Sequence, residues 1–186
     1  VGDLPSELVL AGTVAVPEGA MRNVPDLRPV VHRGDLAIVA GGFNVVGIDR
    51  PTATVVWSAE VVANGLHLAG SICIAVWDRY LVGLSAADGR ELWNREVASE
   101  VLAIAHDVDG IMVALRDGRA LPLDPSTGRS RWHGSEPLDP DASYSSDHVS
   151  AATIVDGAFV WRRWNGALAA VLVATGDACL APGETC

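Results

Sequence analysis

The chain has 186 residues, of which 49% are hydrophobic, so it is long and apolar enough for one domain with a sizeable core. Its 23 acidic and 13 basic residues give a formal net charge of −10, which disfavours nucleic acid as a partner. Every basic residue is an arginine, which excludes chemistry that needs a lysine, such as a Schiff base or a Walker-A phosphate loop. No stretch approaches the ~18 uninterrupted apolar residues of a membrane-spanning helix.

Short β-rich runs separated by tight turns follow one another along the chain. Residues 8–16 form an apolar run that predicts one separate strand. Four groups of runs come next, with turn residues such as Asp-Gly or Asn-Gly between the runs, as is typical of β-hairpins. No segment shows sustained helical periodicity, so the sequence predicts an all-β protein made of four-stranded antiparallel sheets. The groups cover approximately residues 29–62, 65–98, 101–135 and 149–186.

The groups are copies of one repeat. Segments 46–57, 82–93 and 121–132 align by eye, and segment 169–180 aligns more weakly. A turn lies 15 residues before the end of each segment, at Gly42, Asp78, Asp117 and Asn165. The segment ends are 36, 39 and 48 residues apart, and periods of about 40 are typical of propellers or solenoids. The aligned structural positions are Trp57, Trp93, Trp132 and Leu180 at the segment ends, with Gly89, Gly128 and Gly176 four residues earlier.

The second copy, Val-Gly-Leu-Ser-Ala-Ala-Asp-Gly-Arg-Glu-Leu-Trp at 82–93, resembles the repeat of quinoprotein-like (PQQ-like) β-propellers. In that family the repeat reads roughly Leu-x-Ala-Leu-Asp-x-x-Thr-Gly-x-x-x-Trp. The resemblance covers residues 30–180. It implies four-stranded blades in which the Trp of the outermost strand packs between neighbouring blades. WD40-like propellers show the same blade architecture.

The ring could be closed in three ways, because propellers of this family usually have seven or eight blades and the chain supplies about four. We expect residues 1–186 to form a single partial propeller domain that belongs to a longer ring. Pairing with a second copy and closure as a small four-bladed ring are the alternatives. The extra strand at 8–16 would then belong to a preceding blade or complete the ring.

The resemblance does not imply an enzymatic activity. Quinone-dependent dehydrogenases of this family use adjacent cysteines, calcium-binding residues and an Asp base, and this sequence has no adjacent cysteine pair. Asp139, Asp141 and Ser143 resemble the start of a calcium loop but lack the Gly and the closing Glu of an EF-hand. We therefore expect no catalytic residue, no metal site, and neither PQQ nor calcium as a cofactor. A fragment of a PQQ-dependent oxidoreductase is the alternative function.

The histidines and cysteines give weaker signals. None of the histidines has the spacing of a metal motif, and His32, His67 and His106 fall in or beside predicted innermost strands, as polar residues near a central channel or as core histidines. The spacing of Cys179 and Cys186 allows a disulfide that closes a short loop and would favour an extracytoplasmic location.

One face of the propeller is the predicted binding surface. In an up-and-down blade, the turn between the second and third strands lies on the same face as the link to the next blade. Loops on a rigid scaffold commonly carry binding, and aromatic residues and Arg dominate binding hot spots. We therefore predict a non-catalytic module that recognises a protein, a peptide or the remaining blades of the same propeller. The candidate residues are Phe43, Asp78, Arg79, Arg116, Trp164, Asp139, Asp141 and Tyr144, with packing of Trp164 against a neighbouring blade left open.

Overall fold

The computed structural model describes residues 30–41, 43–106, 110–117, 119–131, 152–155, 158–162, 168–172 and 178–179. Within these ranges all regular secondary structure is β-strand, and the strands are antiparallel to their neighbours. The all-β prediction is therefore confirmed. No helix that could cross a membrane occurs in this part of the chain.

The first two sheets have four strands each, arranged in chain order. The first sheet consists of β1 (Val30–Arg33), β2 (Leu36–Gly41), β3 (Asn44–Asp49) and β4 (Thr54–Ala59). The second consists of β5 (Gly65–Ala69), β6 (Ile72–Trp77), β7 (Tyr80–Ser85) and β8 (Glu91–Glu96). In both sheets the register shifts by a bulge at the pairing with the last strand, beside Gly47 and Gly83.

The third and fourth sheets continue the same order. The third contains β9 (Val101–His106), β10 (Ile111–Leu115) and β11 (Ala120–Leu123), and Ser130 forms a single bridge to Leu123. The outer strand predicted at Trp132 lies outside the described residues. The fourth contains β12 (Ala152–Val155), β13 (Ala158–Arg162), β14 (Leu168–Leu172) and β15 (Ala178–Cys179).

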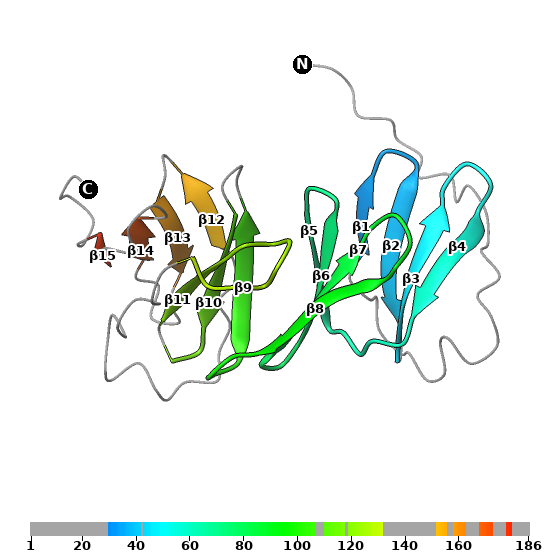
Figure 1. Ribbon diagram of the computed structural model, residues 1–186. Helices are drawn as coiled ribbons and strands as arrows, with labels where there is room; N and C mark the ends of the chain where they lie inside the picture. The colour runs from blue at the N-terminus through cyan, green and yellow to red at the C-terminus, as the bar shows by residue number, and fades with distance from the viewer. Residues whose placement is uncertain are drawn as a thin grey trace, which may run out of the picture.

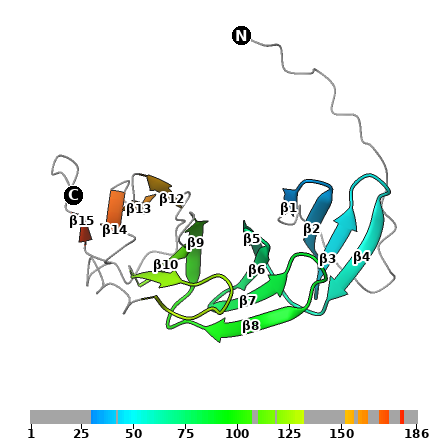
Figure 2. The same cartoon turned by 45° about the horizontal axis from the view of Figure 1, so that its top comes forward.

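The four sheets stand side by side along an arc, as Figures 1 and 2 show. Each sheet turns its first strand toward the inside of the arc, where β1 contacts β5 and β9 contacts β12. The last strands β4 and β8 lie on the outside. This is the blade arrangement of a β-propeller, and we call the sheets blades from here on.

The hydrophobic core is divided between the interfaces of neighbouring blades. Strand β6 shows why, because its consecutive side chains point to opposite faces of the sheet. Cys73 and Ala75 contribute to the core between the first and second blades, whereas Ile74 and Val76 contribute to the core between the second and third blades. All four are at most 8% exposed. A strand that is buried on both faces has no polar alternation, which accounts for the apolar run in the sequence.

The repeated tryptophans clamp one blade to the next. The Trp57 ring lies against Gly47 of its own blade and Gly89 of the following blade, and its Nε1 donates a hydrogen bond of 3.0 Å to the Ala86 carbonyl. Trp93 repeats this arrangement with Gly83, Gly128 and the Pro125 carbonyl, at 2.7 Å. A Cβ on Gly89 would lie 2.4 Å from the Trp57 ring, and one on Gly128 would lie 2.5 Å from the Trp93 ring. The two turn glycines therefore provide the space that each ring fills.

The same glycines also have a backbone role. Gly89 has φ of 72° and Gly128 has φ of 64°, in the left-handed region that residues with a Cβ adopt at a cost. In the first blade the equivalent position is Ala53, and it keeps the left-handed conformation with φ of 53°. The turn geometry is thus the same in all three blades, although the first blade lacks the glycine.

Candidate functional site

In the second and third blades, the turn after the second strand lies beside the link that joins these two blades. The Val97 amide donates to the Arg79 carbonyl at 2.9 Å, and the Val101 amide donates to the Asp78 carbonyl at 2.8 Å. The Arg116 amide donates to the Glu100 carbonyl at 2.8 Å. These hydrogen bonds fix the turn at 78–79, and Arg116 at the end of β10, beside the link at 97–100. We call this surface the turn face.

Exposed aromatic side chains occur at the turn face. Phe43, at the β2–β3 turn, is 69% exposed, and Trp77 and Tyr80 are 44% and 43% exposed. Trp77 and Tyr80 are cross-strand partners on either side of the two-residue turn Asp78-Arg79. Asp78 has φ of 54°, a conformation that Asp tolerates better than most residues. This tight turn holds two aromatic rings at the edge of the blade, and we call Trp77, Arg79 and Tyr80 the aromatic ridge.

Ion pairs fix the charged side chains of the turn face. The Arg79 guanidinium lies 5.7 Å from the centre of the Tyr80 ring, and its Nε lies 3.0 Å from Glu96 Oε1. A hydrogen bond with Tyr80, and then the charge of Glu96, raise the pKa of Arg79. Two further pairs join Arg116 to Glu100 and Arg119 to Asp117. Such exposed pairs contribute about 0–1 kcal/mol to stability, so their main effect is to orient the guanidinium groups.

One polar atom at this surface has no partner. Arg116 Nε is the one buried side-chain nitrogen or oxygen without a hydrogen bond among the described residues. A buried donor without an acceptor is unfavourable by about 1–3 kcal/mol. Because Nε itself is out of contact with solvent, it is not a contact point for a partner at the turn face.

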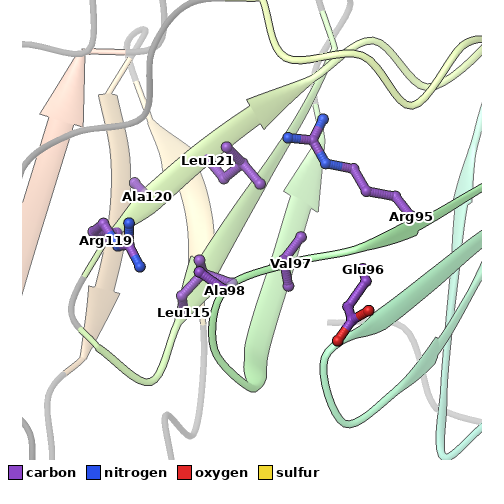
Figure 3. A pocket seen from close by; sticks show the side chains of 8 residues that line it. All are labelled: Arg95, Glu96, Val97, Ala98, Leu115, Arg119, Ala120 and Leu121. Carbon is purple, nitrogen blue, oxygen red and sulfur yellow. The ribbon is translucent and has the colours of Figure 1, made fainter.

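A cleft of about 230 Å³ opens between the second and third blades. Figure 3 shows its lining, in which Val97, Leu115 and Leu121 meet near the centre, while Arg95 and Arg119 lie on opposite sides. Arg95 donates a hydrogen bond of 2.7 Å to the Gly128 carbonyl, and so its guanidinium is held at the blade junction. Glu96 connects the cleft to the aromatic ridge, because it lines the cleft and pairs with Arg79. Ala98 and Ala120 complete the lining.

The structure places four of the predicted binding residues at the turn face: Phe43, Asp78, Arg79 and Arg116. The other four, Trp164, Asp139, Asp141 and Tyr144, lie outside the described residues. Sequence reasoning missed Trp77, Tyr80 and the cleft. The sequence does contain a local signal for the exposure of the two aromatic residues. They directly flank the turn dipeptide Asp78-Arg79, and side chains at the ends of strands lie outside the packed interface between blades.

The remaining sequence predictions concern cysteines and repeat positions. Cys73 is fully buried, and burial raises the pKa of its thiol to about 12. The predicted disulfide stays a prediction, because Cys186 and the side chain of Cys179 lie outside the described residues. The same holds for the roles assigned to Trp132, Leu180 and Gly176.

Comparison with protein families gives a match over residues 41–180 to the model described as outer membrane protein assembly factor BamB. The chain belongs to this family. This result agrees with the PQQ-like propeller repeat recognised in the sequence. Among curated proteins no significant match exists.

Solved structures show the same fold. BamB from Moraxella catarrhalis is 19% identical with a TM-score of 0.60, and the match covers 79% of this chain and 49% of that chain. Sqt1 from Saccharomyces cerevisiae is 15% identical with a TM-score of 0.61, and the match covers 78% of this chain and 44% of that chain. The chain therefore spans less than half of the length of these two proteins. At such low identity, the structural likeness supports the propeller fold alone.

Proposed function

We propose that this chain is a non-catalytic scaffold that binds a protein or peptide partner on the turn face, outside the cytoplasm. The observation that carries the proposal is the position of the aromatic ridge next to the interblade cleft, with Glu96 shared between them. Exposed aromatic residues and arginines beside a concave apolar site have the composition of a binding hot spot. The matched family supports a scaffold role through its description as an assembly factor.

The lining of the cleft indicates the chemistry of the partner. Val97, Leu115 and Leu121 provide an apolar floor for one or two apolar side chains. Arg95 and Arg119 retain further N–H donors beyond the hydrogen bonds that they already make, because a guanidinium carries five. A carbonyl or carboxylate next to the inserted side chain would pair with these donors. The partner is thus an extended segment with an apolar anchor and an adjacent acceptor.

The proposal can be tested by selecting peptides from a random library on the whole chain. Peptides bound by the wild type should bind Trp77→Ala and Leu121→Glu at least tenfold more weakly, since each change removes apolar contact at the ridge or the cleft. Val56→Ala is the matched control, because Val56 is 53% exposed but lies on the outer strand β4. Equal affinities for wild type, Trp77→Ala and Leu121→Glu would overturn the proposal, as would equal losses in the control.

The proposed location needs a separate test. Fractionation of cells that express the natural gene with a C-terminal epitope should recover the protein outside the cytoplasmic fraction. Recovery with a cytoplasmic marker would contradict the extracytoplasmic part of the proposal and leave the binding part intact. The family description as an outer membrane assembly factor is the support for this location.

A further inference from the structure

Two histidines from different blades meet at the inside of the arc. His67 lies on β5 and His106 ends β9, the innermost strands of the second and third blades. His67 Nε2 and His106 Nδ1 are 2.8 Å apart, and the two rings meet edge to face at an angle of 77°. Their cross-strand partners, Ile74 and Ile111, both belong to the core between these blades. Both imidazoles therefore point into the same blade junction.

The two histidines differ in exposure, and the side chain of His67 is half-buried. A neutral imidazole has a free nitrogen lone pair, which is the form that binds metal ions. His106 is exposed, so water can reach the junction from its side.

The distance between the two nitrogens fits a particular coordination geometry. Imidazole nitrogens lie about 2.0 Å from a bound divalent ion. Two such ligands at a right angle are about 2.8 Å apart, whereas tetrahedral ligands are about 3.3 Å apart. Right angles between neighbouring ligands are characteristic of square-planar or tetragonal Cu²⁺ and Ni²⁺. The observed separation of 2.8 Å equals that of two ligands at a right angle, and it is also the length of a direct hydrogen bond.

We propose that His67 and His106 form a two-histidine site for a tetragonal divalent ion, Cu²⁺ or Ni²⁺, that links the second blade to the third. The described residues contain no group of three side chains suited to a metal, so the proposed site has two protein ligands among them and opens to solvent at the exposed side of His106. The facing nitrogens then carry the metal, and the ring protons sit on His67 Nδ1 and His106 Nε2. The site is independent of the turn face and of the partner proposed there.

Sequence spacing could not reveal this pair. Metal motifs are recognised by ligands a few residues apart on one element, whereas these histidines are separated by 39 residues on two blades. They meet because neighbouring blades place their innermost strands side by side.

The competing interpretation is a direct hydrogen bond between two neutral imidazoles, in which one facing nitrogen carries a proton. A metal titration distinguishes the two. The whole chain, without an affinity tag and stripped with EDTA, is titrated with NiCl₂ or CuCl₂ alone in a calorimeter. The proposal expects one equivalent to bind, and binding at least tenfold weaker in His67→Gln and in His106→Gln. His32→Gln, which changes a histidine on the innermost strand of the first blade, should bind as the wild type does.

Two further measurements make the result decisive. The wild type and His32→Gln should gain thermal stability with Cu²⁺, because an ion that binds only the folded state stabilises it. The Cu²⁺ resonance spectrum of the complex should show two equivalent nitrogen ligands. His106→Gln tests the site even if His67→Gln folds poorly, since His106 is exposed. Absence of the one-equivalent binding in the wild type, or its survival in His106→Gln, would establish the hydrogen bond alone and overturn the proposal.

Discussion

The interface between the first and second blades and the interface between the second and third blades share one clamp but differ in the side chains around it. In both, a tryptophan of one blade lies on a turn glycine of the next and donates to a turn carbonyl. The core of the first interface is richer in small residues, such as Ala40, Cys73 and Ala75, and also contains large ones such as Leu84. The second is filled with larger ones such as Leu81, Ile111 and Leu115, and the cleft and the histidine pair both occur there.

This difference distinguishes the features that hold the blades together from the features that could bind a ligand. The clamp depends on backbone conformation and on the space above a glycine, and it recurs at both described interfaces with the same residue types. The cleft and the histidine pair depend on side chains that the repeat leaves free to vary. We therefore expect binding sites where the repeat copies share the same backbone but carry different side chains. The interface between the second and third blades is such a place.

The largest predicted loss of stability comes from substitutions that disrupt the packing of a tryptophan on a turn glycine. Gly89→Ala and Gly128→Ala should each lower the free energy of unfolding by about 2–4 kcal/mol, because the new Cβ meets a tryptophan ring and because φ is positive. Urea unfolding followed by tryptophan fluorescence measures the loss. Similar losses at both sites would show that the two clamps are energetically equivalent, whereas a neutral result at either would contradict the clamp.

The control for this experiment is Gly70→Ala. Gly70 has φ of 60°, and a Cβ built on it meets no atom within 4 Å. Its substitution should cost only the backbone strain, about 1–2 kcal/mol. The excess loss at Gly89 and Gly128 over Gly70 is then the steric contribution of the tryptophan rings.

The clamp was largely predictable from sequence, and the second interface was not. The alignment of Trp57 with Trp93, and of Gly89 with Gly128, follows from local patterns that recur because each copy solves the same packing problem. The all-β class and the antiparallel order follow from turn residues between apolar runs. These are short-range signals that a single sequence records.

The histidine pair and the cleft are long-range features. His67 and His106 become neighbours only when two blades pack, and Leu115 and Val97 line one cleft for the same reason. Phe43 and Arg79 could be placed at the turn face because strand order in a blade fixes which turns share a face. The depth of the cleft between blades depends on side-chain packing, which spacing does not encode.

A smaller effect concerns the turn of the third blade. The Asp124 carboxylate accepts hydrogen bonds from the Ser126 amide at 2.7 Å, the Ser126 hydroxyl at 2.6 Å and the Thr127 amide at 3.1 Å. These bonds, led by the Ser126 hydroxyl, lower the pKa of Asp124. Because the folded pKa lies below the unfolded value of about 3.9, the stabilisation is present above that pH and is lost as pH falls through the folded pKa.

Asp124→Asn should therefore lower the urea midpoint at pH 7 and have a smaller effect at pH 3, because the stabilisation diminishes as the pH falls below the unfolded value of about 3.9. The loss at pH 7 should be about 1 kcal/mol or less, because the side chain remains partly exposed to solvent. Glu60→Gln, which removes an exposed charge outside this turn, controls for the change in net charge. An unchanged difference between wild type and Asp124→Asn at both pH values would refute the assignment of the stabilisation to the ionised carboxylate.

The smallest predicted effect is an increase in stability, and it tests whether the turn before β4 in the first blade has the same backbone conformation as in the other two blades. Ala53 occupies the position of Gly89 and Gly128 and has φ of 53°, which costs an L-residue about 1–2 kcal/mol. Glycine removes that cost but loses about 0.5–1 kcal/mol of backbone entropy on folding. Ala53→Gly should therefore stabilise the chain by about 0.5–1 kcal/mol, measured as a higher urea midpoint. Ala59→Gly, at a β4 position in the same blade, should destabilise it, because glycine weakens strands. Destabilisation by both changes would mean that the first turn does not hold the left-handed conformation in solution, and the three blades would then share the clamp without sharing the turn.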